Sequence, residues 1–457
     1  MMENVSLIVE EISSVLWGPV LVVILLGTGL YFTIRLRFVQ VREFFHGIRI
    51  TAGFFENPRH KGDINHFQAL STALSATIGT GNIAGVATAI ALGGPGAVFW
   101  MWLTGLFGMA LKYASCLLSI KYRVFSEDGT AAGGPMYYLE RGLHIKWLAV
   151  FFAICAAITS FFIGNMVQSN SVADVLKGSF SVPPLLTGIC MAFIVWLVVI
   201  GGIKRIASVT QIIVPFMCAV YILSALFVLF TNAEKIIPAL ELIVRHAFTP
   251  TAATGGFAGS LVLFTIRMGI ARGIFSNEAG LGSAPIAHAA AKENEPVREG
   301  LVGMMGPFID TLVICTLTAL VIVVSGAWSS GLNGASLTAS AFSTKMAAGG
   351  GLVVGFGLVF FALSTTIAWA YYGDRCMYYL FGEKTVRPYR WLYCLFIPVG
   401  AVVKLELIWN LADIANAFMA FPNLVGLLGL SGVVMKQTES YARKLSIAKK
   451  LHKKKWF

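Results

Sequence analysis

The sequence predicts an all-α polytopic membrane protein of about eleven transmembrane helices, and three observations support this. Of the 457 residues, 57% are hydrophobic and only 12% are charged, whereas about a quarter of the residues in an ordinary soluble domain are charged. The apolar residues form runs of about 20, the length that a helix needs to cross a hydrocarbon core. Many of the 47 glycines lie inside these runs, as membrane helices tolerate.

Eleven such runs can be placed along the chain. The first is long enough to be a retained spanning helix rather than the apolar core of a cleaved signal peptide. The predicted spans are 14–34, 66–92, 95–118, 147–170, 181–202, 210–231, 255–290, 300–325, 350–373, 390–408 and 411–435. Residues 14–435 therefore form the transmembrane domain, between an N-terminal segment (1–13) and a basic tail (436–457).

Lys and Arg divide unequally between alternate connections, which predicts the orientation of the chain. Most of them lie in one set, the segments 35–61, 112–146, 204–205, 292–298 and 375–390 with the tail. The other set holds only Lys177, Lys235, Arg245, Lys345 and Lys404. Because cytoplasmic loops retain Lys and Arg, we predict a prokaryotic inner-membrane protein with its N-terminus outside and its C-terminus in the cytoplasm.

The net charge of +12 favours an anionic inner leaflet over nucleic acid as a partner, because the basic residues lie in short connections and the tail. The segment 35–61 mixes Arg with Phe, Val and Ile. It is either an amphipathic stretch on that leaflet or a solvated loop. The tail 436–457 is interpreted as an orientation and lipid anchor.

Two of the predicted spans carry glycines and small polar residues at their centres. The first run, ATIGTGNIAG, covers residues 76–85, and the second, ARGIFSNEAGLGS, covers residues 271–283. An uninterrupted membrane helix satisfies its own backbone, so a break there needs a compensating role. For either run alone, close packing of helices through small residues is the favoured alternative.

The two runs occupy matching positions in the chain. Each lies in the span that opens a group of five, 66–231 and 255–435, and the groups begin on opposite sides of the membrane. Discontinuous helices at matching positions of inverted repeats are typical of a substrate and ion site at the midplane. Unwinding frees N–H groups for a carboxylate and carbonyls for an ammonium group or Na⁺. The pairing across both repeats therefore favours a site over packing.

Three segments closely resemble the alanine or glycine:cation symporter family. They are GTGNIAG (79–85), GGPMYY (133–138) and FSNEAGLGSAPIAH (275–288), and the resemblance extends from about residue 14 to residue 436. It implies the LeuT-type fold, with ten core helices in two inverted repeats and a peripheral first helix. It also implies Na⁺-coupled uptake of a small neutral amino acid by alternating access. Coupling to H⁺, or a larger neutral substrate such as glutamine, is the alternative.

The same resemblance implies a substrate site between the two broken spans. Thr80 and Gly81 would bind the substrate carboxylate through backbone amides, and Thr80 also through its hydroxyl. Asn82 would lie where ion and substrate meet, and Gln168 would face the pocket. The residues implied around the amine and the substrate side chain are Ile274, Phe275 and Ser276, as unwound backbone, and Trp369, as a limit on size.

A cation site is implied between the spans 66–92 and 350–373. The adjacent hydroxyls of Ser364 and Thr365 resemble the ion-binding pair of this fold. The carbonyls that would complete the site are those of Ser75, Ile78 and Phe361. Neutral oxygen ligands suit a monovalent ion better than a divalent one. The alternative is that these hydroxyls bond only to carbonyls one turn back in their own helix.

Ionisable residues inside the predicted spans need partners, because a charge at the bilayer centre costs at least about 2.5 kcal/mol. Asp310 is a candidate ligand of a second cation site together with Asn82, or a protonatable group if coupling is to H⁺. Glu278 is expected to pair with Arg267 or Arg272. That pair would be either structural or part of transport.

Other function classes find less support. No zinc-protease, nucleophile-elbow or phosphate-loop motif stands in a plausible setting, so we do not expect an enzyme. A channel or membrane sensor could also use broken helices, but channels usually build their filter from repeated subunits. The seven cysteines lie in or beside apolar runs and predict neither a disulfide framework nor a metal cluster. The sequence does not identify which of alanine, glycine, serine and glutamine is the substrate. A monomer is expected to suffice for transport.

Overall fold

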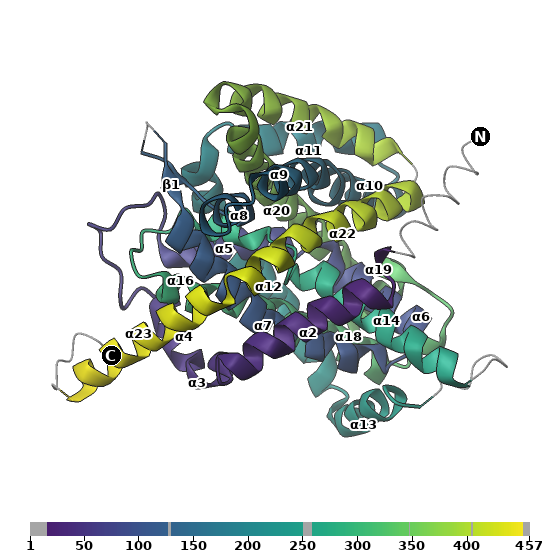
Figure 1. Cartoon of the computed structure of the whole chain (residues 1–457). Helices are drawn as coiled ribbons and strands as arrows, with labels where there is room; N and C mark the ends of the chain where they lie inside the picture. The colour runs from purple at the N-terminus through teal and green to yellow at the C-terminus, as the bar shows by residue number, and fades with distance from the viewer. Residues whose placement is uncertain (1–15, 127–128, 250–257, 347, 404, 451–457) are drawn as a thin grey trace.

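The computed structural model describes residues 16–126, 129–249, 258–346, 348–403 and 405–450. These residues confirm the all-α class. Besides helices, they contain one two-stranded antiparallel hairpin, β1 (Val124–Phe125) and β2 (Ala131–Ala132), at the edge of the bundle (Figure 1). The predicted N-terminal segment 1–13 and the last residues of the tail, 451–457, lie outside the described part of the chain.

The helices follow the predicted order. The first predicted repeat contains α5 (His66–Thr77), α6 (Val86–Gly93), α7 (Ala97–Tyr122), α9 (Lys146–Phe161), α10 (Val167–Phe180), α11 (Pro184–Val199) and α12 (Gly202–Phe230). The second contains α14 (Ala258–Asn277), α15 (Ala284–His288), α16 (Pro296–Gly303), α17 (Met305–Pro307), α18 (Thr316–Val324), α20 (Ala348–Phe381), α21 (Val386–Val402) and α22 (Leu405–Gly429). The remaining helices are α2 (Pro19–Arg35), α3 (Val39–Arg42), α4 (Phe44–Thr51), α8 (Pro135–Gly142), α13 (Ile236–His246), α19 (Gly334–Met346) and α23 (Ser431–Lys450).

The helices confirm a multi-pass membrane protein. Within the described residues, six are long and apolar enough to cross a membrane, or seven if the bent pair α5 and α6 is one span. Two shorter apolar helices, α2 and α11, match predicted spans, and α14 and α21 occupy the other two. The count of eleven stays a prediction. Figure 1 shows α2 lying across the bundle beside α7 and α22, outside the two groups of five.

The first predicted break is present. Helix α5 begins with a capping box, in which Asn65 and Gln68 each accept the other's backbone N–H, and it ends at Thr77. Ile78 is extended, and the chain resumes as a π-helical turn at Gly81–Gly85 before α6. The two halves are bent by 54°. The amides that open the second half have no partner within the helix.

The second break is also present within the predicted run, but only its second part, after Asn277, is unwound. Ile274, Phe275 and Ser276 are still helical, and α14 ends at Asn277. The following residues adopt positive φ, with values of 52° at Glu278 and 91° at Gly280. The prediction that residues 274–276 are unwound is therefore wrong, because the glycines that permit the turn follow Asn277.

The structure departs from prediction at two basic residues and gives defined helices to two further basic segments. Lys112 and Arg375, assigned to connections, lie inside α7 and α20, where both are buried. Most of the tail, up to Lys450, forms the helix α23, which leads away from the bundle toward the C-terminus in Figure 1. The segment 35–61 contains the helices α3 and α4, and Phe45 on α4 is 78% exposed, as an amphipathic segment requires.

Candidate functional site

The two helix breaks face one another around a small closed cavity. Its volume is about 10 Å³, and its walls are Ala76, Thr77, Gly79, Thr80, Gly81, Ile163, Gln168, Phe275, Glu278 and Thr365. A cavity of this size holds about one water molecule. Any larger ligand therefore requires the wall helices to separate. Four of the predicted substrate residues, Thr80, Gly81, Gln168 and Phe275, lie on this wall.

Close approach of the two breaks explains the glycine at position 81. A Cβ atom there would lie 3.1 Å from Ser276 Cα and 3.2 Å from Phe275 Cδ1. A side chain at position 81 would therefore require Ser276 and Phe275 on α14 to shift by a few tenths of an ångström. The amides of Thr80 and Gly81 lie in that first turn, so they are available to a ligand rather than to their own helix.

Gln168 bridges the first break to the π-helical turn at Phe162–Met166. Its Nε2 donates to the carbonyl of Ile163 at 3.0 Å and lies 3.5 Å from Thr80 Oγ1. Its Oε1 is buried and has no hydrogen-bond partner within the described part of the chain. An unpaired buried acceptor costs about 1–3 kcal/mol, and a ligand with an N–H group in the cavity would remove that cost.

Glu278 supplies the only carboxylate on the cavity wall, and sequence reasoning did not place it there. Its Oε1 accepts from Trp369 Nε1 at 2.9 Å, and its Oε2 accepts from the hydroxyl of Ser283. Trp369 is fully buried but acts on the cavity through Glu278 rather than by lining it. The feature of the sequence that could have placed Glu278 at the cavity is an acidic residue inside a glycine-rich break.

The predicted ion pair of Glu278 with an arginine is wrong. Glu278 receives its hydrogen bonds from uncharged donors, and Arg272 Nη2 lies 3.9 Å from Asp413 Oδ2 on α22 instead. The guanidinium of Arg272 also lies 5.8 Å from the centre of the Phe275 ring. This geometry places a charged contact between α14 and α22 next to the aromatic ring that closes the cavity.

The backbone of the second break departs from the helical pattern at Ala279. In a continuous helix, this amide would donate to the carbonyl four residues earlier. Here it donates to Asn277 Oδ1 at 2.9 Å, so the Asn277 side chain marks the end of α14.

A second polar cluster joins both breaks to the π-helical turn at Phe308–Cys315. Asp310 Oδ1 accepts from Asn82 Nδ2 at 2.7 Å, and its Oδ2 accepts from Ser276 Oγ at 2.9 Å and from Thr311 Oγ1 at 2.7 Å. Asn82 Oδ1 in turn accepts from the amide of Gly79 at 2.9 Å. Asn82, Ser276 and Asp310, which the sequence singled out, thus meet at one buried point.

A third cluster lies between α5 and α20 and contains all five residues predicted there. Thr365 Oγ1 lies 3.0 Å from the carbonyl of Ser75, 3.4 Å from that of Ile78 and 2.9 Å from that of Phe361. Ser364 Oγ is 2.9 Å from the Phe361 carbonyl as well. These contacts include the bonds to the previous turn that formed the alternative interpretation. They also bring five uncharged oxygens from two helices together.

The chemistry of the third cluster fits a weakly held monovalent cation. Carbonyl and hydroxyl oxygens carry no formal charge, whereas divalent ions in proteins usually draw on carboxylates. Within the described residues, no group of three or more His, Cys, Asp or Glu side chains is placed to hold a metal ion.

A histidine and glutamate cluster lies at the end of the bundle where the basic connections gather. His66 and His288 each contact Glu299, at 2.6 and 2.5 Å, through their Nδ1 atoms. Glu293 lies 3.4 Å from His66 Nε2 and 3.1 Å from His60 Nδ1. Burial alone would raise the pKa of the Glu293 carboxyl, but hydrogen bonds from His66 and the backbone and the charge of Arg298 lower it to about 2.

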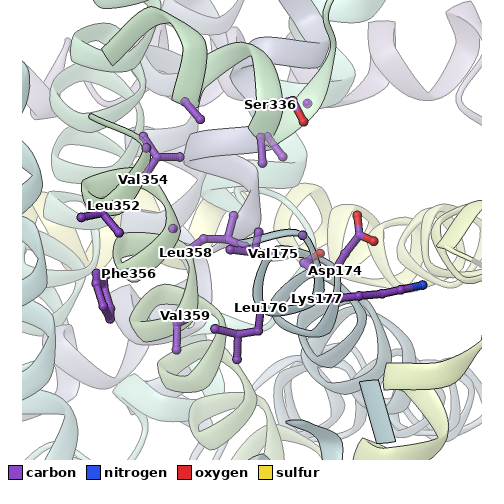
Figure 2. Close-up of a pocket in the computed structure, with 18 of the residues that line it drawn as sticks. Asp174, Val175, Leu176, Lys177, Ser336, Leu352, Val354, Phe356, Leu358 and Val359 are labelled. Carbon is purple, nitrogen blue, oxygen red and sulfur yellow. The ribbon is translucent and has the colours of Figure 1, made fainter. Parts of the chain in front are cut away.

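A much larger cavity, about 980 Å³, lies at the opposite end of the bundle between α6, α10, α19 and α20. Figure 2 shows apolar side chains of α10 and α20 side by side in it, with Asp174 and Lys177 extending from α10. Ala84 and Thr88 of the first broken pair also line it. Since Ala84 follows Gly81 by one turn, this cavity comes close to the small closed one.

Comparison with known proteins identifies relatives along the whole chain. The model of the sodium:alanine symporter family matches residues 2–455. The sodium/alanine symporter AgcS of Methanococcus maripaludis is 50% identical, over 96% of this chain and 98% of its own length. The probable sodium/glutamine symporter GlnT of Bacillus subtilis is 37% identical, over 97% of this chain and 92% of its own.

Solved structures of low sequence identity share the architecture. The crystal structure of MhsT in complex with L-phenylalanine aligns with a TM-score of 0.62 at 12% identity, covering 83% of this chain and 93% of its own. A Na⁺-coupled sialic acid symporter in a substrate-bound outward-open state aligns with a TM-score of 0.52 at 10% identity, covering 84% and 82%. These likenesses show the LeuT-type fold alone. The family match and the relatives along nearly the whole length go further: the chain belongs to the sodium:alanine symporter family.

Proposed function

We propose that this protein is a secondary active transporter that carries a small neutral amino acid of the alanine and glycine class into the cell together with Na⁺. The observation that supports this most directly is the shared position of the two helix breaks. They enclose one small cavity, and oxygen clusters adjoin it on two sides. The 50% identity to a sodium/alanine symporter supports the same substrate class.

The polar groups of the cavity suit the two ends of a zwitterion. The amides of Thr80 and Gly81 open a half-helix, whose positive end favours a carboxylate. On the opposite side, Gln168 Oε1 and the Glu278 carboxylate are acceptors for an ammonium group. The substrate would therefore lie across the cavity with its carboxylate toward α6.

The walls limit the substrate side chain. Phe275 and Ile163 leave little room in the closed state, and Trp369 holds Glu278 from behind through its indole N–H. A methyl group or hydrogen needs little displacement of these residues, whereas a longer side chain needs more. One or two methylene groups change the binding free energy by only about 1–3 kcal/mol. Alanine and glycine are therefore expected to bind more tightly than glutamine, without excluding it completely.

Two cation positions adjoin the substrate. In the first, Na⁺ would be coordinated by the neutral hydroxyl oxygen of Thr365, with the hydroxyl proton turned away from the ion. The other ligands would be the carbonyls of Ser75, Ile78 and Phe361 and the hydroxyl of Ser364. In the second, Asp310 would bind a cation beside Asn82. If the coupling ion were H⁺, the same carboxylate would be the group to accept it.

The first break couples ion and substrate. The Ile78 carbonyl, at the end of the first half, contacts the cation cluster, while Thr80 and Gly81, two and three residues later, line the cavity. Both ligands would stabilise the same bend. Each should then tighten the other by an equal factor, typically 5- to 150-fold.

The arrangement of the two ends supports alternating access. The cavity of 980 Å³ beside α6 would be the outer vestibule, with the Arg272–Asp413 contact between α14 and α22 helping to hold Phe275 over the substrate. At the other end, α5 packs against α12 and α20, which closes the cytoplasmic route. We place the protein in the inner membrane, with the N-terminus outside and the C-terminus in the cytoplasm. A single subunit contains every group of the proposed site.

Uptake into proteoliposomes tests this function. Labelled alanine, glycine, serine and glutamine would be supplied under an imposed Na⁺ gradient, an imposed H⁺ gradient or neither. We expect alanine and glycine to accumulate only with inward Na⁺, and external unlabelled substrate to accelerate exchange. Accumulation driven by H⁺ alone would show that the coupling ion is H⁺ rather than Na⁺, and flux without saturation or counterflow would contradict a transporter.

A further inference from the structure

The basic end of the bundle contains a cavity that the proposed transport cycle does not use. Its volume is about 1070 Å³, and it lies between the end of α11, the start of α12, the end of α20 and the start of α21. Its basic lining residues are Lys204, Arg375, Lys384, Arg387 and Arg390, against the acidic Asp63 and Glu383. A cavity lined mainly by cations favours an anionic ligand.

The two deepest cations are held rigidly. Arg375 donates to Asp374 Oδ1 at 2.7 Å through Nη2, and its guanidinium lies 5.5 and 5.1 Å from the rings of Tyr371 and Tyr378. Arg390 donates through Nε to Asp374 Oδ2 at 2.7 Å. One buried carboxylate thus serves two guanidinium groups, which leaves a net positive charge at the base of the cavity.

The rim of the cavity is apolar and exposed. Ile200, just after α11, is 42% exposed, and Phe381, at the end of α20, is 67% exposed. Both follow membrane-spanning segments, so they lie where the helices leave the hydrocarbon. Lys204, Lys384 and Arg387 are exposed beside them. Apolar residues next to flexible cations are the arrangement that contacts acyl chains and phosphates together.

We propose that this cavity binds the phosphate headgroup of an anionic phospholipid of the cytoplasmic leaflet. Basic pockets between transmembrane helices on the cytoplasmic side bind such headgroups. The volume is that of a site for a drug-sized ligand, larger than an inorganic phosphate requires. The placement in the inner leaflet rests on the proposed orientation of the chain, but binding to the cavity does not depend on transport.

Native mass spectrometry of the purified full-length protein, delipidated in detergent, tests the proposal. Dioleoyl phosphatidylglycerol and dioleoyl phosphatidylcholine would be titrated separately, with inorganic phosphate and glycerol phosphate as competitors. We expect phosphatidylglycerol to saturate one site at least tenfold more tightly than phosphatidylcholine. The soluble phosphates should compete only weakly, because they lack the acyl chains that contact the rim.

The variant that removes two of the three exposed cations is Lys384→Gln with Arg387→Gln. Each basic residue near an anionic surface contributes about 1 kcal/mol, so we expect a loss of affinity for phosphatidylglycerol of roughly 30-fold. The matched control is Lys436→Gln with Arg443→Gln, which removes the same charge from exposed positions on α23. The control should bind like the wild type.

Three outcomes would overturn the proposal. Equal loss in the two double variants would show a diffuse charge effect rather than a site. Unchanged binding in the Lys384 and Arg387 variant would exclude this cavity. If inorganic phosphate displaced bound phosphatidylglycerol at concentrations as low as those at which phosphatidylglycerol itself binds, the cavity would be a site for a soluble anion. In each case Na⁺-driven uptake, measured separately, would stand or fall on its own result.

Discussion

The indole N–H of Trp369 donates to Glu278 at 2.9 Å, so the carboxylate on the cavity wall is held from behind by a residue on α20. This contact joins the second helix break to the helix that carries the cation cluster. Trp369→Phe keeps most of the ring but removes the donor. Since a hydrogen bond to a charged group contributes about 1.5–3 kcal/mol, we expect alanine affinity to fall about tenfold or more in equilibrium binding.

The control for this substitution is Trp391→Phe. Trp391 is 51% exposed on α21. The Trp391→Phe protein should therefore bind alanine like the wild type. An unaltered alanine affinity in Trp369→Phe would mean that Glu278 keeps its position without the indole.

Substitution of Gly81 tests the carboxylate end of the site. A Cβ atom at this position would already be tight against Ser276 and Phe275, and the two further methyl groups of valine would enter the cavity. Gly81→Val should therefore abolish alanine binding in correctly inserted protein, and Gly81→Ala should weaken it. Scintillation proximity binding with labelled alanine gives the measurement.

Gly85→Ala is the matched control for Gly81. It lies in the same π-helical turn, and a Cβ atom there meets nothing within 4 Å. The loop residue Gly331 is less suitable because its φ of 77° strains any other residue. Normal alanine binding by Gly81→Val would remove this end of the proposed site.

The cation cluster is tested by the hydroxyls of α20. Ser364→Ala with Thr365→Ala removes two of five oxygens, so the Na⁺ concentration for half-maximal uptake should rise roughly tenfold while the order of substrates is kept. Thr366→Ala is the control, because its hydroxyl bonds to the carbonyl of Ala362 in its own helix at 2.9 Å. If the Na⁺ concentration for half-maximal uptake were the same in the double variant and in Thr366→Ala, the hydroxyls of Ser364 and Thr365 would only bond to the previous turn and would not bind the cation.

Cysteine labelling tests the orientation. Ser330 precedes α19 and Ser446 lies on α23, and both are exposed. In a background where the exposed Cys190 is replaced by serine, a membrane-impermeant maleimide applied to intact cells should label Ser330→Cys and not Ser446→Cys. The opposite pattern would invert the proposed topology and place the vestibule of 980 Å³ in the cytoplasm.

The acidity of Glu293 predicts a pH-dependent stability. Its pKa of about 2 lies below the ordinary 4.5, so its ionised form stabilises the folded state fully above about pH 4.5, and this contribution disappears as pH falls toward 2. Glu293→Gln should therefore lower the melting temperature in detergent at pH 6, and less so at pH 3. An equal decrease at both values would show that the carboxylate charge is not involved.

Sequence reasoning found the breaks because glycine, asparagine and small residues cannot serve an uninterrupted apolar helix. The resemblance grouped Ser75, Ile78, Phe361, Ser364 and Thr365, and these five residues lie together in the structure, while their role as a cation site stays a prediction. Sequence reasoning failed where the partner comes from a distant segment. Glu278 meets Trp369, 91 residues away, and Arg272 meets Asp413 on α22. Residues so far apart in the sequence form no local pattern that would reveal their contact. The exact end of α14 depends on the positive φ at Glu278 rather than on composition.

The contact between Gly164 and Trp369 restricts how this family can change its preference. A Cβ atom at position 164 would lie 2.1 Å from Trp369 Cβ and 2.4 Å from its Cγ, so any other residue there would displace Trp369 and with it the partner of Glu278. Because the nearest atom is a Cβ, which every residue except glycine carries, replacing Trp369 would not by itself make room for a side chain at 164. Position 164 is therefore expected to stay glycine even where position 369 has changed to tune the substrate range.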